Sequence, residues 1–193
     1  MSFLADPPEP DPDVERLYEA DRDRLGYVAN YTRALAWRPA AVDAWTGLNG
    51  AIRSTMDLRR YELITLAAAR RLGSAYCSLA HGRLLRERFY DAGTLARIAT
   101  DHRDAGLDPA DAAIMDFAER VAGDPNGITA EDVAVLREHG LSDPEILDVA
   151  LAAAARCFFS TVIAAVGAEP DPAYAAVLDR ALFEALTTAH DAA

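Results

Sequence analysis

The chain has 193 residues, of which 51% are apolar, and it carries a formal net charge of −12. A chain of this length fits one domain and buries a core without disulfide bonds. The excess of negative charge argues against a basic binding face, so we expect neither nucleic acid nor an anionic membrane as a partner. All 19 positive charges are arginines, and the absence of lysine excludes Schiff-base chemistry and a lysine general base.

The two cysteines, Cys77 and Cys157, fit neither a disulfide framework nor a zinc knuckle. A reducing cytoplasm is therefore the expected location. The first 13 residues lack the basic and apolar regions of a signal peptide. The apolar run between Val149 and Gly167 is interrupted by Arg156, which argues against a membrane span. We expect a soluble protein.

Residues 1–12 hold four prolines and three acidic residues, so they are predicted to form an extended arm. The remainder, residues 13–193, is predicted to be a single helical domain. Alanine dominates it and β-branched residues are sparse, which favours an all-α bundle of eight to ten helices. The expected helices cover about residues 13–26, 27–38, 39–54, 58–72, 75–90, 93–102, 109–122, 130–139, 144–166 and 172–190.

Two of these helices are expected to carry apolar faces with distinct roles. The helix at 39–54 places Val42, Trp45, Leu48 and Ile52 on one amphipathic stripe. The helix at 144–166 is apolar nearly all round in its second half, so it is expected at the centre of the bundle or at a subunit interface.

The chemistry of the chain is concentrated between Glu62 and His81. Gly73 is expected to end one helix and Ser74 to cap the next, which places Cys77 in its first turn. Cys77 and His81 are four residues apart and share a helix face. A helix N-terminus and a neighbouring imidazole both favour a thiolate. If the two helices are antiparallel, Glu62 and His81 differ by only about 4–5 Å in height, which allows a Glu–His–Cys proton relay.

The segments YELITLAAA and SAYCSLAHGRLL, with Glu62, Ser74, Cys77 and His81, resemble the alkylhydroperoxidase D-like (AhpD-like) group of the carboxymuconolactone decarboxylase superfamily. The flanking segments GYVANYTRALAWRP and GLSDPEILDVALAAAARCFFSTVIAAVG resemble its peroxidase-related branch, and the resemblance spans about residues 25 to 170. It implies the AhpD-like helical fold, a homo-oligomer and no bound cofactor.

In that family a peroxidatic cysteine is deprotonated through histidine and glutamate, and a cysteine three residues earlier resolves it as a disulfide. The resemblance therefore implies Cys77 as nucleophile, His81 as base and Glu62 as the acceptor that orients His81. Ser74 stands where the resolving cysteine is found, and serine cannot form the disulfide. Cys77 would then form a sulfenic acid reduced by an external thiol, or be resolved by Cys157, or not turn over at all.

Other residues have structural interpretations beside the functional ones. Ser74 is interpreted as a helix cap, with hydrogen bonding to the Cys77 sulfur as an auxiliary role, and Tyr76 as a packing residue that could also gate a substrate. Cys157 is expected in the core. We expect the remaining histidines at the surface and no metal site. These histidines are His102, His139 and His190.

The leading hypothesis is a peroxidase-related oxidoreductase that reduces hydroperoxides through Cys77. A second is a decarboxylase-like lyase in which His81 and Glu62 transfer protons on a small carboxylated compound. The third is a non-catalytic oligomeric helical module.

Overall fold

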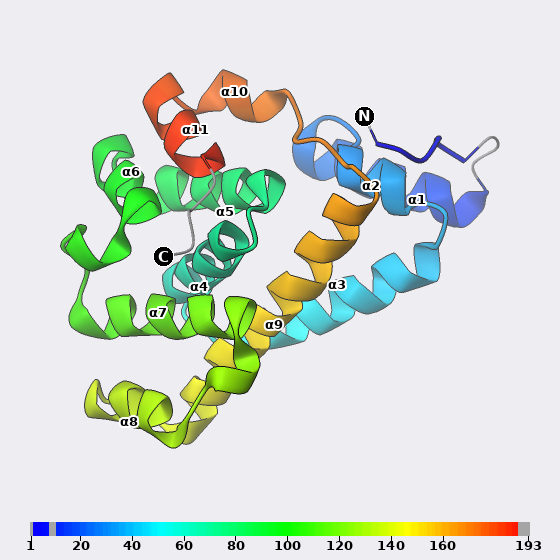
Figure 1. Ribbon diagram of the computed structural model, residues 1–193. Coiled ribbons are helices and arrows are strands. Elements are labelled where there is room, and N and C mark those ends of the chain that lie inside the picture. Colours follow the sequence, from blue (N-terminus) through cyan, green and yellow to red (C-terminus); the bar gives the residue numbers. More distant parts are fainter. Residues whose placement is uncertain (1, 8–10, 189–193) are drawn as a thin grey trace.

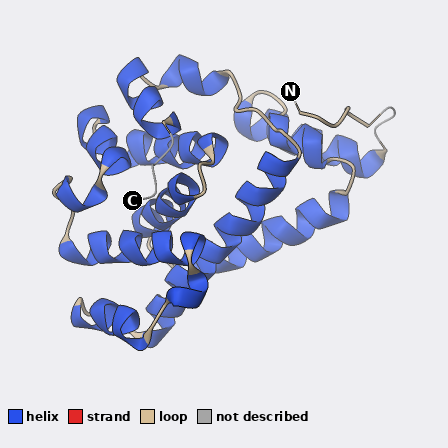
Figure 2. Ribbon diagram, in the orientation of Figure 1, coloured by secondary structure: helices blue, strands red, loops and turns tan. Residues whose placement is uncertain are grey.

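The computed structural model describes residues 2–7 and 11–188, and no strand occurs within these ranges (Figure 2). The described residues form eleven α-helices, two of them shorter than seven residues, and two 3₁₀ turns (Figure 1). The all-α prediction is confirmed. The helices are α1 (Pro12–Leu25), α2 (Asn30–Leu35), α3 (Pro39–Ser54), α4 (Leu58–Arg71), α5 (Ala75–Arg88), α6 (Ala92–Thr100), α7 (Pro109–Gly123), α8 (Ala130–Glu138), α9 (Asp143–Ala165), α10 (Ala173–Val177) and α11 (Arg180–Thr187).

Helix α4 lies at the centre of the bundle. Every residue from Tyr61 to Arg70 is buried, and the helix packs against α5, α7 and α9. Ala67, Ala68 and Ala69 are almost fully buried, and their small side chains let neighbouring helices approach closely. The residues of α4 that face α5 are therefore shielded from water on all sides.

The turn between α4 and α5 follows local sequence signals. Asp57 caps α4 by accepting a hydrogen bond from the Arg60 N–H at 3.0 Å. Gly73 has φ of +65°, a left-handed conformation that glycine adopts without the steric cost of a Cβ. This turn reverses the chain and sets α5 beside α4 (Figure 1).

The prediction of a single C-terminal helix at 172–190 is wrong. It is divided into α10 and α11, because the chain is extended at Leu178 and Asp179. The Asp179 side chain accepts a hydrogen bond from the Leu182 N–H at 2.9 Å and so begins a new helix. The end expected near His190 lies outside the described residues.

Two helices leave apolar side chains exposed. The stripe expected on α3 is buried only at Ile52, while Leu48 is 54% exposed. On α9, the longest helix, Phe158 is 57% exposed and Leu151 is 40% exposed. By length and composition α9 could cross a membrane, but a core helix passes the same test and nearly half of its most apolar window is buried.

The N-terminal segment lies against the rest of the chain where the structure describes it. The Phe3 N–H donates to the Val166 carbonyl at 2.8 Å, and the Trp37 indole donates to the Ala5 carbonyl at 2.8 Å. Asp6 pairs with Arg33 at 3.0 Å. These contacts connect the segment to α2 and to the end of α9.

Candidate functional site

Cys77 occupies the third position of α5 and is 1% exposed. Ser74 stands at the N-cap position with extended backbone angles, but its side chain makes no capping hydrogen bond. The N-cap placement expected for Ser74 is therefore found without the side-chain bond that usually accompanies it. The sulfur lies in the first turn of the helix, where the unpaired backbone N–H groups favour an anion.

Glu62 and His81 are in direct contact. The His81 Nδ1 lies 2.6 Å from the Glu62 Oε2, and the Glu62 side chain is 3% exposed. The antiparallel packing of α4 and α5 produces this contact, as the helix geometry predicted. Because Nδ1 faces a carboxylate, it holds the ring proton of a neutral imidazole and leaves Nε2 as the proton acceptor.

The protonation state of His81 suits a base. Burial lowers the pKa of His81, the positive charge of Arg156 lowers it further, and Glu62 opposes both effects. The imidazole is therefore neutral at neutral pH and available to take up a proton. Cys77 lies one helical turn away on the same face of α5.

Arg156 is the residue that sequence reasoning missed. It lies on α9 and is 5% exposed, and its Nη1 is 3.6 Å from the Cys77 Sγ. The guanidinium is packed over the rings of Trp45 and Phe159, with centroid distances of 6.0 and 5.4 Å. The signal in the sequence was a single arginine inside an apolar helix, which we had interpreted only as evidence against a membrane span.

Tyr76 is a packing residue in this structure. Its side chain is 4% exposed, its hydroxyl donates to the Asp171 carboxylate, and it accepts the Tyr31 N–H at 3.4 Å. Burial is the main cause that raises the pKa of Tyr76, followed by the bond to Asp171. With its hydroxyl held by Asp171, Tyr76 anchors the start of α5 to the segment before α10.

Cys157 is half-buried rather than fully in the core, and both cysteines are free thiols. Burial raises the pKa of the Cys157 thiol, so little of it is ionised at neutral pH. Its neighbour Arg156 is the α9 residue that contacts Cys77. A raised pKa disfavours the thiolate of Cys157, which is the reactive form of a cysteine.

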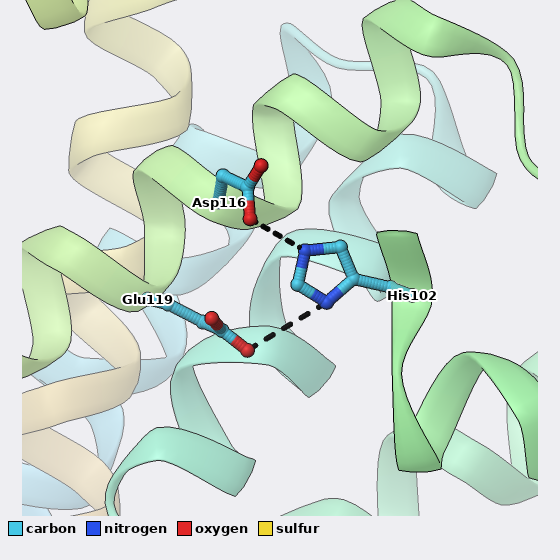
Figure 3. Close-up of side chains that lie close together, drawn as sticks. All are labelled: His102, Asp116 and Glu119. Carbon is cyan, nitrogen blue, oxygen red and sulfur yellow. Dashed lines mark hydrogen bonds and ion pairs between the residues drawn. The ribbon is translucent and has the colours of Figure 1, made fainter. Parts of the chain in front are cut away.

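The expectation that His102 lies at the surface is wrong. Its ring is 3% exposed and lies between two α7 carboxylates, with Nε2 2.9 Å from Asp116 Oδ1 and Nδ1 3.6 Å from Glu119 Oε1 (Figure 3). Arg103 also pairs with Asp116, and with Glu119 at 3.2 Å. His139 is exposed as expected, and His190 lies outside the described residues.

The His102 cluster is the group in the described part of the chain whose donor atoms could hold a cation, since its three donor atoms lie within 4.8 Å of one another. Both imidazole nitrogens already face carboxylates, and Arg103 neutralises the same two acids. These contacts make the cluster a salt-bridge network that joins the 3₁₀ turn at His102–Asp104 to α7.

The carboxymuconolactone decarboxylase family model matches residues 39–120, a range that contains Glu62, Cys77 and His81. The structure of an uncharacterized peroxidase-related protein from Silicibacter sp. TM1040 is 26% identical, covers 90% of this chain and 93% of its own, and has a TM-score of 0.81. The chain therefore has the AhpD-like fold, and its segment 39–120 matches the carboxymuconolactone decarboxylase family.

Other AhpD-like structures share the fold at lower identity. An AhpD-core, peroxidase-related protein from Ralstonia eutropha JMP134 is 23% identical, covers 98% of both chains and has a TM-score of 0.81. The debrominase Bmp8, solved in complex with 2,3,4-tribromopyrrole, is 18% identical, covers 88% of this chain and 91% of its own, and has a TM-score of 0.72. No curated protein matches the chain. One AhpD-like fold thus serves proteins named for different reactions.

Proposed function

We propose that this AhpD-like protein is a peroxidase-related oxidoreductase that reduces hydroperoxides with the Cys77 thiolate. The observation that carries the proposal is the placement of a buried thiol one turn before a histidine that a buried glutamate holds at 2.6 Å. This arrangement supplies a nucleophile, a neutral base and a group that orients the base.

In the first step His81 Nε2 takes the thiol proton and the sulfur attacks the terminal oxygen of the hydroperoxide. The S–O bond forms as the O–O bond breaks, so the sulfur becomes a sulfenic acid and the peroxide is reduced to an alcohol. The departing alkoxide takes its proton from the His81 imidazolium, which restores the neutral base. The two electrons come from the sulfur.

The second step requires a thiol from outside the site. Ser74 holds no sulfur, and Cys157 ionises poorly because burial raises its pKa. An external thiol attacks the sulfenic acid, which releases water and leaves a mixed disulfide. A second external thiol then attacks the external sulfur of this disulfide, so the Cys77 thiolate leaves and the two external thiols are released as a disulfide. A cycle of this kind needs a reducing compartment, so we place the protein in the cytoplasm.

The contact between Glu62 and His81 also supports a second candidate, a lyase that acts on a small carboxylated compound. That pair is complete without sulfur, and a neutral imidazole can move a proton on a carbon acid. The two candidates differ in their need for Cys77. Loss of its sulfur abolishes peroxide reduction and spares the lyase, whereas loss of His81 impairs both.

The test is consumption of an organic hydroperoxide by the purified protein with dithiothreitol as reductant. Cys77→Ser should abolish turnover, and Cys157→Ser, the matched control, should retain it. His81→Ala should lower the rate by about 10²-fold or more, because general base catalysis is lost. The proposal is contradicted if no thiol reductant supports turnover, or if Cys77→Ser remains active.

We also propose that the protein is a homo-oligomer whose subunits meet through α3 and α9. Leu48, Leu151 and Phe158 are exposed apolar side chains on these two helices, which pack against each other, and exposed apolar patches mark association sites. The same helices contribute Trp45 and Arg156 to the surroundings of the thiol. Association there would shield that side of the site from water.

A further inference from the structure

Arg156 is a buried charge that pairs with no carboxylate in the described part of the chain. The residue is 5% exposed and its Nη1 lies 3.6 Å from the Cys77 sulfur; the guanidinium also interacts with the Tyr61 hydroxyl, and its Nε has no partner among the described residues. A buried guanidinium is costly unless an opposite charge compensates it. The Cys77 thiol provides that compensation only when it is ionised.

A second buried arginine, Arg70, has a structural role in the same fold and serves as a comparison. Arg70 is 8% exposed, and its Nη1 donates to the Ala185 carbonyl at 2.7 Å, so it ties α4 to α11. Arg156 makes no comparable bond to the backbone in residues 2–7 and 11–188. Its contacts are with the Cys77 sulfur, the Tyr61 hydroxyl and the rings of Trp45 and Phe159.

In the proposed mechanism the Cys77 proton passes to the His81 imidazole. While the proton is on sulfur, the Arg156 charge faces a neutral thiol, and once the proton has left, the thiolate lies beside Arg156. An opposite charge in contact with the sulfur stabilises the thiolate. Arg156 also lowers the pKa of His81, so the imidazole passes the proton on rather than keeping it.

We propose that Arg156 is the counter-ion of the Cys77 thiolate, a positioning residue that favours loss of the proton from the sulfur. The inference rests on the proposed function only in taking Cys77 as the reacting group. It adds a fourth residue, from α9, to the three that α4 and α5 supply. It involves no oxidation, since only a proton moves.

The test measures the ultraviolet absorbance of the thiolate at pH about 7 without peroxide. All variants carry Cys157→Ser, so that Cys77 is the only cysteine that contributes a thiolate signal. The double variant Cys77→Ser/Cys157→Ser gives the absorbance without any thiolate, which is subtracted as the baseline. Arg156→Gln should lower the thiolate signal about tenfold or more, because the thiolate then loses the opposite charge in contact with it. Arg70→Gln, the matched control, should leave the signal unchanged.

The inference is overturned if folded Arg156→Gln protein keeps the thiolate signal of its parent. If this variant does not fold, the infrared S–H stretch of the Cys157→Ser protein decides the question. A weak or absent S–H band from Cys77 at neutral pH supports the inference, and a full band refutes it. Neither measurement uses peroxide, so a failure of hydroperoxide reduction leaves the result for Arg156 unaffected.

Discussion

At the scale of single residues, the site depends on a histidine kept neutral and a sulfur kept close to positive charge. Burial and Arg156 lower the pKa of His81, while Glu62 holds its Nδ1. The pairing of Glu62 with His81 was predictable, because both positions follow from one turn and two regular helices. The contact between Arg156 and Cys77 was not, because it joins residues 79 positions apart through the packing of α9.

The lowered pKa of His81 predicts that the free energy of unfolding falls in acid. Below pH about 6.5 the unfolded chain binds a proton at this residue that the folded chain does not, and each unit of lowering costs about 1.4 kcal/mol. Above that pH the contribution is constant. His81→Gln should therefore lose less stability than the wild type between pH about 7.5 and 5.

Urea unfolding at both pH values measures this difference. His139→Gln is the matched control, since His139 is exposed, and its loss of stability in acid should equal that of the wild type. Equal losses for wild type and His81→Gln would refute the assigned neutral state.

At the scale of elements, local signals predicted most boundaries and tertiary packing decided the rest. Capping residues such as Asp57 and the glycine at 73 act within one turn, so the sequence alone locates α4 and the start of α5. The burial of His102 depends on acids from α7, and the split between α10 and α11 depends on an aspartate cap that lies in an otherwise helical pattern. A periodicity search detects neither.

The packing of α5 against α11 makes Gly82 sensitive to substitution. A Cβ at this position would lie 2.5 Å from Cδ1 of Leu186, which is itself 1% exposed. We expect Gly82→Ala to destabilise the protein by about 1–3 kcal/mol, because overpacking outweighs the gain in helix propensity.

Gly47 on α3 provides the control, because a Cβ there meets nothing within 4 Å. Gly47→Ala should raise the free energy of unfolding by up to about 1 kcal/mol. Both values come from chemical denaturation. Stabilisation of both variants would show that α5 and α11 are less tightly packed than the structure indicates.

At the scale of the whole molecule, α3 and α9 lie side by side (Figure 1) and leave Leu48, Leu151 and Phe158 exposed. The sequence predicted that the apolar helix at 144–166 lies at the centre or at an interface, yet the helix with the longest buried run is α4, from Tyr61 to Arg70. Apolar composition alone does not distinguish a core helix from a helix at a subunit interface, because both are buried in apolar surroundings. The exposed fractions of individual side chains make the distinction.

If α3 and α9 form the subunit interface, introducing a charge there should change the association state of the protein. Phe158→Glu should shift sedimentation toward the monomer, because a carboxylate at the proposed interface cannot be desolvated without a partner. Val135→Glu on α8, where Val135 is 46% exposed, should sediment like the wild type. If the wild type is itself a monomer at micromolar concentration, the proposed interface is wrong.

The central claim, that Cys77 is the reactive thiol, is tested most directly by mass spectrometry after graded hydroperoxide exposure with dimedone present. Dimedone adds to a sulfenic acid, so the protein reports which sulfur was oxidised. We predict a dimedone adduct on Cys77 that grows with peroxide dose, while Cys157, whose pKa burial raises, stays unmodified. An unmodified Cys77, or an adduct on Cys157 alone, would contradict the account.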